Sequence, residues 1–182
     1  MDNILKKIKT ECSTYLEESW GNPAIKNLHF DGRFVKKVKV RRKKQSDNFI
    51  QLFDEAFESE YREIYGRSIF CNGSHQKPSV EDKYLFYVFP INGYKFLYNP
   101  DADYHKEYHN IYEKLKSTID AETAKLMFKD MIKYSYNAES IQLADALFSE
   151  NEIIVYNIPY YYAVMCNKHP NYTALLNTIL DS

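Results

Sequence analysis

Apolar residues recur at helical spacing in several segments of the chain. Residues 3–19 carry apolar side chains at every third or fourth position and end at a Gly-Asn-Pro stop. Residues 47–65 have the longest continuous apolar face, with Ser46 or Asp47 as the N-cap and Gly66 as the C-terminal cap. The same spacing predicts further helices over 103–117, 120–135, 139–148 and about 172–180.

Other segments alternate or are apolar throughout, which predicts strands. Residues 34–41 read as a half-buried strand, although Lys36 interrupts the alternation. Residues 84–89 form an apolar run that ends at Pro90, and Asn92-Gly93 signals a hairpin turn into a returning strand over 94–98. Further strands are predicted over 67–72, 152–156 and 160–165, and a polar loop over 73–82.

The order of these elements predicts the fold class. Helices do not alternate regularly with strands, and neighbouring strands can pair antiparallel. We therefore expect an α+β fold, with an antiparallel or mixed sheet core flanked by helices, rather than a doubly wound sheet. No linker composition divides the chain, so residues 1–182 form one domain with an N-terminal helix (about 3–19) and a helical insertion (about 103–148).

Composition excludes several classes of protein. The chain has only 5 glycines and lacks the GxGxxG, Walker A and CxxC motifs, so Rossmann enzymes, P-loop NTPases and zinc ribbons lose their support. No apolar run is long enough for a membrane span or a signal peptide. Cys12, Cys71 and Cys166 are odd in number and widely spaced, which favours free core thiols in a reducing compartment.

Two compositional features allow more than one interpretation. The 17 tyrosines suit either a large core or a binding surface, and the burial of their rings distinguishes the two. Residues 33–44 hold a dense block of Lys and Arg in a chain of net charge -1. This block fits contact with phosphate, including nucleic acid, or a solvated strand edge whose lysines discourage aggregation.

A histidine pair raises the question of a metal site. His105 and His109 are four residues apart on a predicted helix, and His75 and Asp103 are the further ligands available nearby. The segment HKEYH lacks the glutamate that directly follows the first histidine in zinc proteases. We therefore expect no metal site.

Three segments together carry a resemblance to a known family. Arg41-Arg42 ends the basic strand, a strand with the sequence RSIFCNGS begins at Arg67, and Ser149-Glu150-Asn151-Glu152 leads into another strand. This order resembles the arginine–serine–glutamate class of ADP-ribosyltransferases. Residues 42–98 are also similar to a group of uncharacterised bacteriophage proteins, and the resemblance spans most of 34–165.

The resemblance implies a site and a chemistry. The fold would be a split-sheet, ADP-ribosyltransferase-like α+β fold in which the helices of 103–148 are inserted, and NAD would be a substrate. The resemblance gives each site residue a role: Glu152 is catalytic, Glu150 faces the acceptor, Ser68 orients the glutamate, Phe70 packs near nicotinamide, Gly73 contributes to cofactor binding, and Arg42, or Arg41 in its place, holds NAD.

The expected function follows from this resemblance. It implies a phage-encoded, NAD-dependent mono-ADP-ribosyltransferase that modifies a host protein or nucleic acid in the bacterial cytoplasm, or that is carried in the virion. The alternative is a non-enzymatic phage protein, either a virion or injected component or an inhibitor of host machinery that acts by protein–protein binding. The sequence leaves open whether the chain is an active enzyme.

Overall fold

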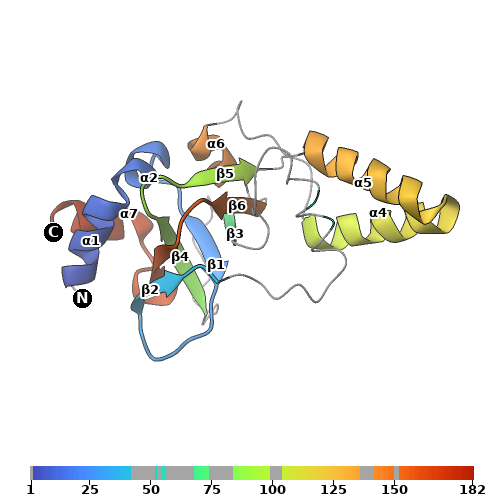
Figure 1. Cartoon of the computed structure of the whole chain (residues 1–182). Helices are drawn as coiled ribbons and strands as arrows, with labels where there is room; N and C mark the ends of the chain where they lie inside the picture. The colour runs from blue at the N-terminus through green and yellow to red at the C-terminus, as the bar shows by residue number, and fades with distance from the viewer. Residues whose placement is uncertain are drawn as a thin grey trace.

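The fold is α+β, as the order of elements predicts. The computed structural model describes residues 2–41, 52, 55, 68–73, 84–98, 104–135, 142–149 and 152–182. Within these residues a 7-stranded antiparallel sheet has the strand order β2-β7-β4-β1-β3-β6-β5 (Figure 1).

The strands are β1 (Ala24–Asn27), β2 (Val35–Lys39), β3 (Ile69–Gly73), β4 (Leu85–Pro90), β5 (Lys95–Tyr98), β6 (Glu152–Tyr156) and β7 (Tyr160–Met165). The helices are α1 (Asp2–Glu11), α2 (Ser13–Glu18), α4 (Tyr104–Thr118), α5 (Ala121–Ser135), α6 (Leu143–Phe148) and α7 (Tyr172–Leu180). No helix among the described residues is long and apolar enough to cross a membrane.

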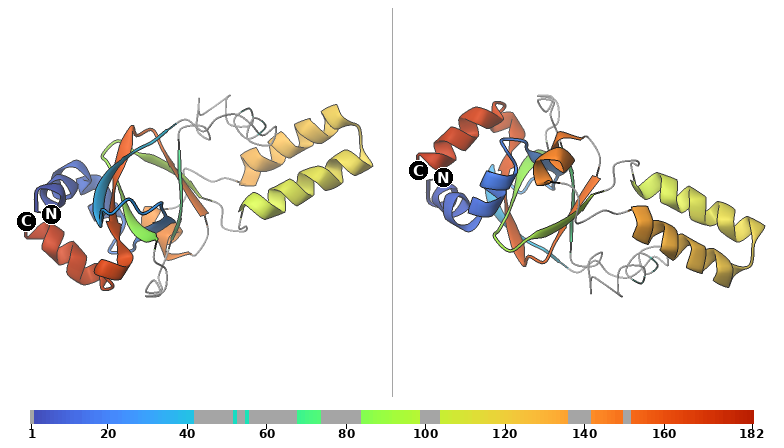
Figure 2. Two further views of the ribbon diagram at one scale, coloured as in Figure 1. Left: turned by 90° about the horizontal axis from the view of Figure 1, so that it is seen from below. Right: turned by 90° about the horizontal axis from the view of Figure 1, so that it is seen from above.

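The sheet bends sharply around β1. Only residues 91–94 join β4 to β5, although β1, β3 and β6 lie between these strands in the sheet. In a flat sheet, four interstrand spacings alone span about 19 Å, whereas the five Cα–Cα steps of the link reach at most about 18 Å when fully extended, and residues 92–93 form a turn that shortens it. The bend falls at β1, which pairs over its whole length with β4 but only through Ala24 and Ile25 with β3. Figure 2 shows the strands crossing one another instead of lying in one flat layer.

The core lies on both sides of β4 and β7. Every residue of β4 is buried, and so are the last five residues of β7. On one face, helices α1 and α7 pack together beside the two chain termini (Figure 1). Tyr172 of α7 covers that face of β4, with its ring centroid 4.7 Å from Tyr87 and 6.2 Å from Phe89.

Helices α4 and α5 form a hairpin that extends away from the sheet in every view (Figures 1 and 2). Phe128 of α5 contacts two aromatic rings of α4, Tyr108 at 5.9 Å and Tyr112 at 4.9 Å between ring centroids. Glu55 forms ion pairs with Lys125 at 2.9 Å and Lys129 at 2.5 Å. The predicted helical insertion thus contains a projecting two-helix unit.

Three sequence-based expectations were wrong. The N-terminal helix is two helices that meet at Cys12, and strand β1 lies where the sequence analysis placed none. The expected hairpin is absent, since β4 pairs with β1 and β7 while β5 pairs with β6. Asn92 explains the difference: its Oδ1 accepts from the Thr14 backbone N–H at 3.0 Å and its Nδ2 donates to the Ser13 hydroxyl, so the turn is tied to the helices.

Some expectations fall outside the described residues. The helix predicted over 47–65 is described only at Leu52 and Glu55, both of which are helical. The loop predicted over 73–82 is described only at Gly73, which ends β3. Of the helix predicted over 139–148, the structure describes α6 and Gln142 before it.

Candidate functional site

Glu152 lies at the start of β6, directly opposite Asn72 of β3. In the same register Phe70 lies opposite Ile154. Because side chains alternate along a strand, Glu152, Asn72 and Phe70 share one face of the sheet. Glu152 and Phe70 are half-buried, and Asn72 is exposed. The carboxylate of Glu152, the amide of Asn72 and the ring of Phe70 therefore lie on one face of the sheet, where β3 ends and β6 begins.

The structure does not place Ser68 beside Glu152. Ile69 lies opposite Val155, so Ser68 comes opposite Tyr156, four residues from Glu152 along β6. Four residues of extended strand cover about 13 Å. The amide of Asn72, rather than the hydroxyl of Ser68, is the polar group next to the carboxylate. The sequence analysis missed Asn72 because only the register of β3 against β6 identifies it.

Lys26 of β1 brings a positive charge to this part of the sheet. Its ammonium donates a hydrogen bond to the backbone oxygen of Phe70. Burial lowers the pKa of Lys26, while the nearby Cys71 and Glu152 act in the opposite direction. Lys26 therefore lies within electrostatic reach of Glu152; the sequence marked it only as one of the clustered basic residues and gave it no role at this site.

Gly73 has a packing role that its place in the sequence did not reveal. A Cβ atom at this position would lie 2.2 Å from the Ser149 backbone oxygen and 2.3 Å from that of Leu147. Only a residue without a side chain fits so close to the end of α6. This contact holds the segment that leads from α6 into Glu152 against β3, and a contribution of Gly73 to cofactor binding stays a prediction.

The two predicted arginines lie at the far edge of the sheet from β6 or outside the described residues. Arg41 is exposed just beyond β2, and four strands separate β2 from β6 in the strand order. Arg42 and Glu150 lie outside the described residues. Their roles toward NAD and the acceptor therefore stay predictions.

One lysine of the described basic block is buried in the fold. Lys36 is only 6% exposed, donates to the His29 backbone oxygen at 2.6 Å and lies over the ring of Phe86. Lys37 lies over the ring of Tyr160 at 3.3 Å from its centroid but stays exposed. Arg33, Lys39 and Arg41 are exposed too, so among the described side chains the phosphate-binding interpretation of residues 33–44 loses Lys36 alone.

Neither the cysteines nor the histidine pair forms a described reactive site. Cys12, Cys71 and Cys166 are all buried and none forms a disulfide, which confirms them as core thiols. Burial raises the pKa of Cys71 to about 12, so its thiol stays protonated. Among the described residues no group of three or more potential ligands can hold a metal ion. His75, Asp103 and the side chain of His105 lie outside that description.

An unpredicted polar cluster ties α1 to the start of β7. Glu11 Oε2 accepts hydrogen bonds from the hydroxyls of Tyr162 at 2.6 Å and Tyr160 at 2.9 Å. The Tyr162 hydrogen bond is the main cause that lowers the pKa of Glu11, and Tyr160, Lys37 and Lys7 add to it against the opposing effect of burial. This cluster anchors the N-terminal helix on the sheet.

The chain was also compared with family models, curated proteins and solved structures. None of the three comparisons found a match. The function must therefore be argued from the residues and their arrangement.

Proposed function

We propose that the chain is an NAD-dependent mono-ADP-ribosyltransferase whose catalytic carboxylate is Glu152. The observation that carries the proposal is the pairing of Glu152 with Asn72 on the face that also holds Phe70. The order of Arg41, β3 and the Glu-x-Glu segment along the chain is the basis of the family resemblance, which also supports the proposal. By that resemblance the enzyme acts on a host macromolecule in the bacterial cytoplasm, or it is carried in the virion.

The chemistry needs the residue types found in this group. The bond between ribose C1′ and the nicotinamide nitrogen breaks, and its electron pair leaves with nicotinamide. The ribose then carries an oxocarbenium-like positive charge, which the carboxylate of Glu152 stabilises. A nucleophilic oxygen or nitrogen of the acceptor bonds to C1′ and loses its proton, which completes the transfer.

The neighbours of Glu152 have supporting roles in this proposal. The side-chain amide of Asn72 donates to the carboxylate and fixes its orientation, a task that the resemblance gave to Ser68. The ring of Phe70, two residues along β3, provides an apolar surface for nicotinamide. Holding the phosphates of NAD falls to Arg42, because a guanidinium presents a fork of donors to phosphate oxygens, whereas Arg41 follows β2, four strands from β6 in the strand order.

The proposal is tested with NAD labelled in its adenylate part and a bacterial lysate. We expect label to move onto a macromolecule and free nicotinamide to appear in equal amount. The Glu122→Gln variant, which changes an exposed carboxylate on α5, should transfer label like the unaltered protein. Folded protein that releases no nicotinamide and transfers no label would exclude the proposed activity.

A second candidate function is a non-enzymatic partner-binding protein. The observation that favours it is the projecting α4–α5 hairpin, on which Leu126, Met127 and Tyr134 are 56%, 52% and 86% exposed (Figure 1). Exposed apolar side chains on a projecting element suit a protein interface. Such a protein would be a virion or injected component, or an inhibitor of host machinery.

The tyrosines give this second candidate less support than the sequence suggested. Among those whose side chains are described, most are buried; they are Tyr15, Tyr87, Tyr98, Tyr108, Tyr156, Tyr161, Tyr162 and Tyr172. The test is therefore made on the hairpin. Replacing both Leu126 and Met127 with Glu should abolish recovery of a specific bacterial partner, whereas replacing Lys114 and Lys116 with Glu should not. Recovery that is unchanged by the apolar substitutions would exclude the hairpin as the interface.

A further inference from the structure

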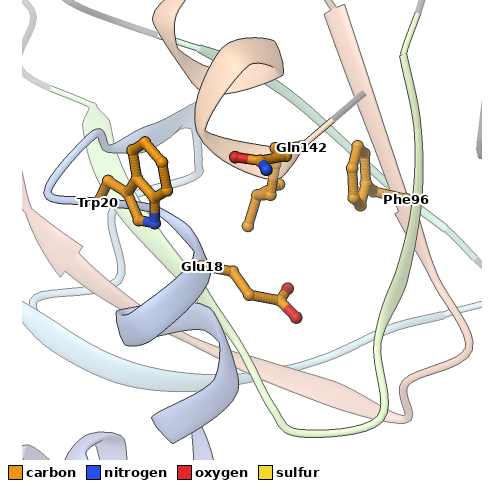
Figure 3. A pocket seen from close by; sticks show the side chains of 5 residues that line it. Glu18, Trp20, Phe96 and Gln142 are labelled. Carbon is orange, nitrogen blue, oxygen red and sulfur yellow. The ribbon is translucent and has the colours of Figure 1, made fainter. Parts of the chain in front are cut away.

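A pocket of about 400 Å³ lies between the end of α2, strand β5 and the start of α6 (Figure 3). Among the described residues, those that line it are Glu18, Trp20, Phe96, Gln142 and Leu143. Phe96 lies opposite Val155 of β6. Because Val155 and Glu152 are an odd number of residues apart, they face opposite sides of that strand. The pocket is therefore separate from the face that carries Glu152.

Trp20 stands at one side of the pocket in an unusual backbone conformation. It is the only tryptophan of the chain, it is 72% exposed, and its φ of 49° is in the left-handed region. A bulky residue in this region is conformationally strained. The turn is held because the backbone N–H and the side chain of Asn22 both donate to the Ser19 oxygen. The fold thus keeps a strained, exposed indole beside a pocket.

Glu18 supplies the negative charge of the pocket. Its Oε2 accepts a hydrogen bond from the Tyr94 hydroxyl, and burial together with Glu18 itself raises the pKa of Tyr94, so this donor stays protonated. Within the described part of the chain no Lys or Arg forms an ion pair with Glu18. Lys95 is the nearest cation in sequence to Phe96, and strand alternation directs it to the other face of β5.

The close view shows how these groups are arranged. The indole of Trp20 and the ring of Phe96 stand on opposite sides, the Glu18 carboxylate lies between and below them, and Gln142 lies above (Figure 3). A carboxylate beside the ring face of Phe96 favours a positive group, because a ring face and a carboxylate both carry negative potential. An anion would meet repulsion from these two groups.

We propose that this pocket binds an organic cation that carries a guanidinium group. The group belongs either to an Arg side chain of a partner polypeptide or to a free small molecule. Glu18 accepts its N–H donors, Trp20 and Phe96 cover its faces, the Gln142 side-chain oxygen accepts one further hydrogen bond, and Leu143 contacts its methylene groups. The site is independent of the proposed transferase activity.

The only tryptophan makes the proposal directly measurable. The full chain is titrated with Nα-acetyl-arginine amide, with methylguanidine and with Nα-acetyl-citrulline amide, while the fluorescence of Trp20 is recorded. Citrulline has nearly the shape of arginine but no charge. We expect a saturable change with the two cations and none with the citrulline compound. Tighter binding of the arginine amide than of methylguanidine indicates a polypeptide source, and the reverse indicates a free small molecule.

Variants assign the response to the pocket. Glu18→Gln should weaken cation binding about 10-fold or more, since it removes the charge but keeps the size. Glu17→Gln, on the same helix but outside the pocket, and Glu152→Gln should bind the cation like the unaltered protein. If Glu18→Gln fails to fold, Phe96→Leu should produce the same weakening. An equal response to the citrulline compound, no saturable response to either cation, or equal binding by Glu17→Gln and a folded Glu18→Gln would overturn the proposal.

Discussion

Asn72 lies directly opposite Glu152 across the β3–β6 pair. Residues opposed in this way have Cβ atoms about 4.5–5.5 Å apart, so an amide and a carboxylate at such positions are within hydrogen-bonding reach. If the chain acts as the proposed transferase, this register favours Asn72 over Ser68 for the orienting role that the family resemblance gives to Ser68.

Replacing Asn72 with Ala should lower the rate of ADP-ribosyl transfer about 10-fold or more, because a misoriented carboxylate stabilises the oxocarbenium-like charge poorly. Asn72 is exposed, so the free energy of unfolding should change by no more than about 0.5 kcal/mol. Steady-state release of nicotinamide measures the rate, and urea unfolding measures the stability.

Ser68→Ala is the matched comparison for this prediction. Ser68 lies opposite Tyr156, about 13 Å along the strand from Glu152, so its hydroxyl should matter less than the amide of Asn72. A larger rate loss in Ser68→Ala than in Asn72→Ala would contradict the assignment and favour the role that the resemblance implies.

Gly73→Ala should destabilise the fold by about 1–3 kcal/mol, the usual cost of forcing extra atoms into a packed site. The added methyl group would lie 2.2 Å from the Ser149 oxygen, and a backbone atom cannot easily give way. Urea unfolding measures this change, with the neighbouring Asn72→Ala as the control. A variant that keeps full stability but loses NAD binding would show that Gly73 serves the ligand instead of the packing.

Lys36→Ala should cost about 2 kcal/mol of unfolding free energy. Lys36 is buried on β2, and its ammonium donates to the His29 backbone oxygen, which would lose that partner. Lys39→Ala on the same strand changes an exposed side chain and should stay within about 0.5 kcal/mol. Thermal unfolding of Lys36→Ala and Lys39→Ala measures both changes. Equal losses of unfolding free energy in the two variants would refute a structural role specific to Lys36.

The sequence predicted where the helices and strands lie better than which strands pair with one another. Periodicity located the strands at 84–89, 152–156 and 160–165 because their apolar residues form unbroken runs. The sequence analysis missed β1. The segment Ala24–Asn27 is short, and because only Ala24 is buried while Lys26 and Asn27 are polar, it shows no clear strand pattern. The sequence analysis also missed the break at Cys12, where both helices continue the same apolar face.

Pairing and register depend on contacts between distant segments, which a local pattern does not contain. Asn92-Gly93 carries the signal of a hairpin, but Asn92 bonds to α1 and α2 instead, and β5 joins β6. The candidate site shows the same limit. Glu152 was singled out from its Glu-x-Glu segment, whereas the position of Asn72 opposite it, and of Lys26 near it, became visible only when three strands were placed side by side.

Acid should weaken the attachment of α1 to the sheet through Glu11. Its pKa is lowered in the folded protein, chiefly by the Tyr162 hydrogen bond. A lowered carboxyl pKa contributes stability above the unfolded value of 4.5, and this contribution disappears as the pH falls through the folded pKa. The free energy of unfolding of Glu11→Gln should therefore lie further below that of the unaltered protein at pH 6 than at pH 3.

Urea unfolding at the two pH values checks this prediction. Glu17→Gln on α2 removes an exposed carboxylate and should show a small difference at both pH values. Tyr162→Phe should lower the free energy of unfolding at pH 6 by about 1 kcal/mol, because it removes one hydrogen bond to the carboxylate of Glu11. A Glu11→Gln effect that grows as the pH falls would contradict the assigned sign.

The most direct test of the proposed transferase is Glu152→Gln, measured by nicotinamide release and by calorimetric titration with NAD. Removing one electrostatic stabiliser of the transition state should lower the rate about 100-fold or more. NAD affinity should change only a few-fold, since the charge matters more in the transition state than in the ground state. A folded Glu152→Gln protein that releases nicotinamide at the unaltered rate would contradict the account.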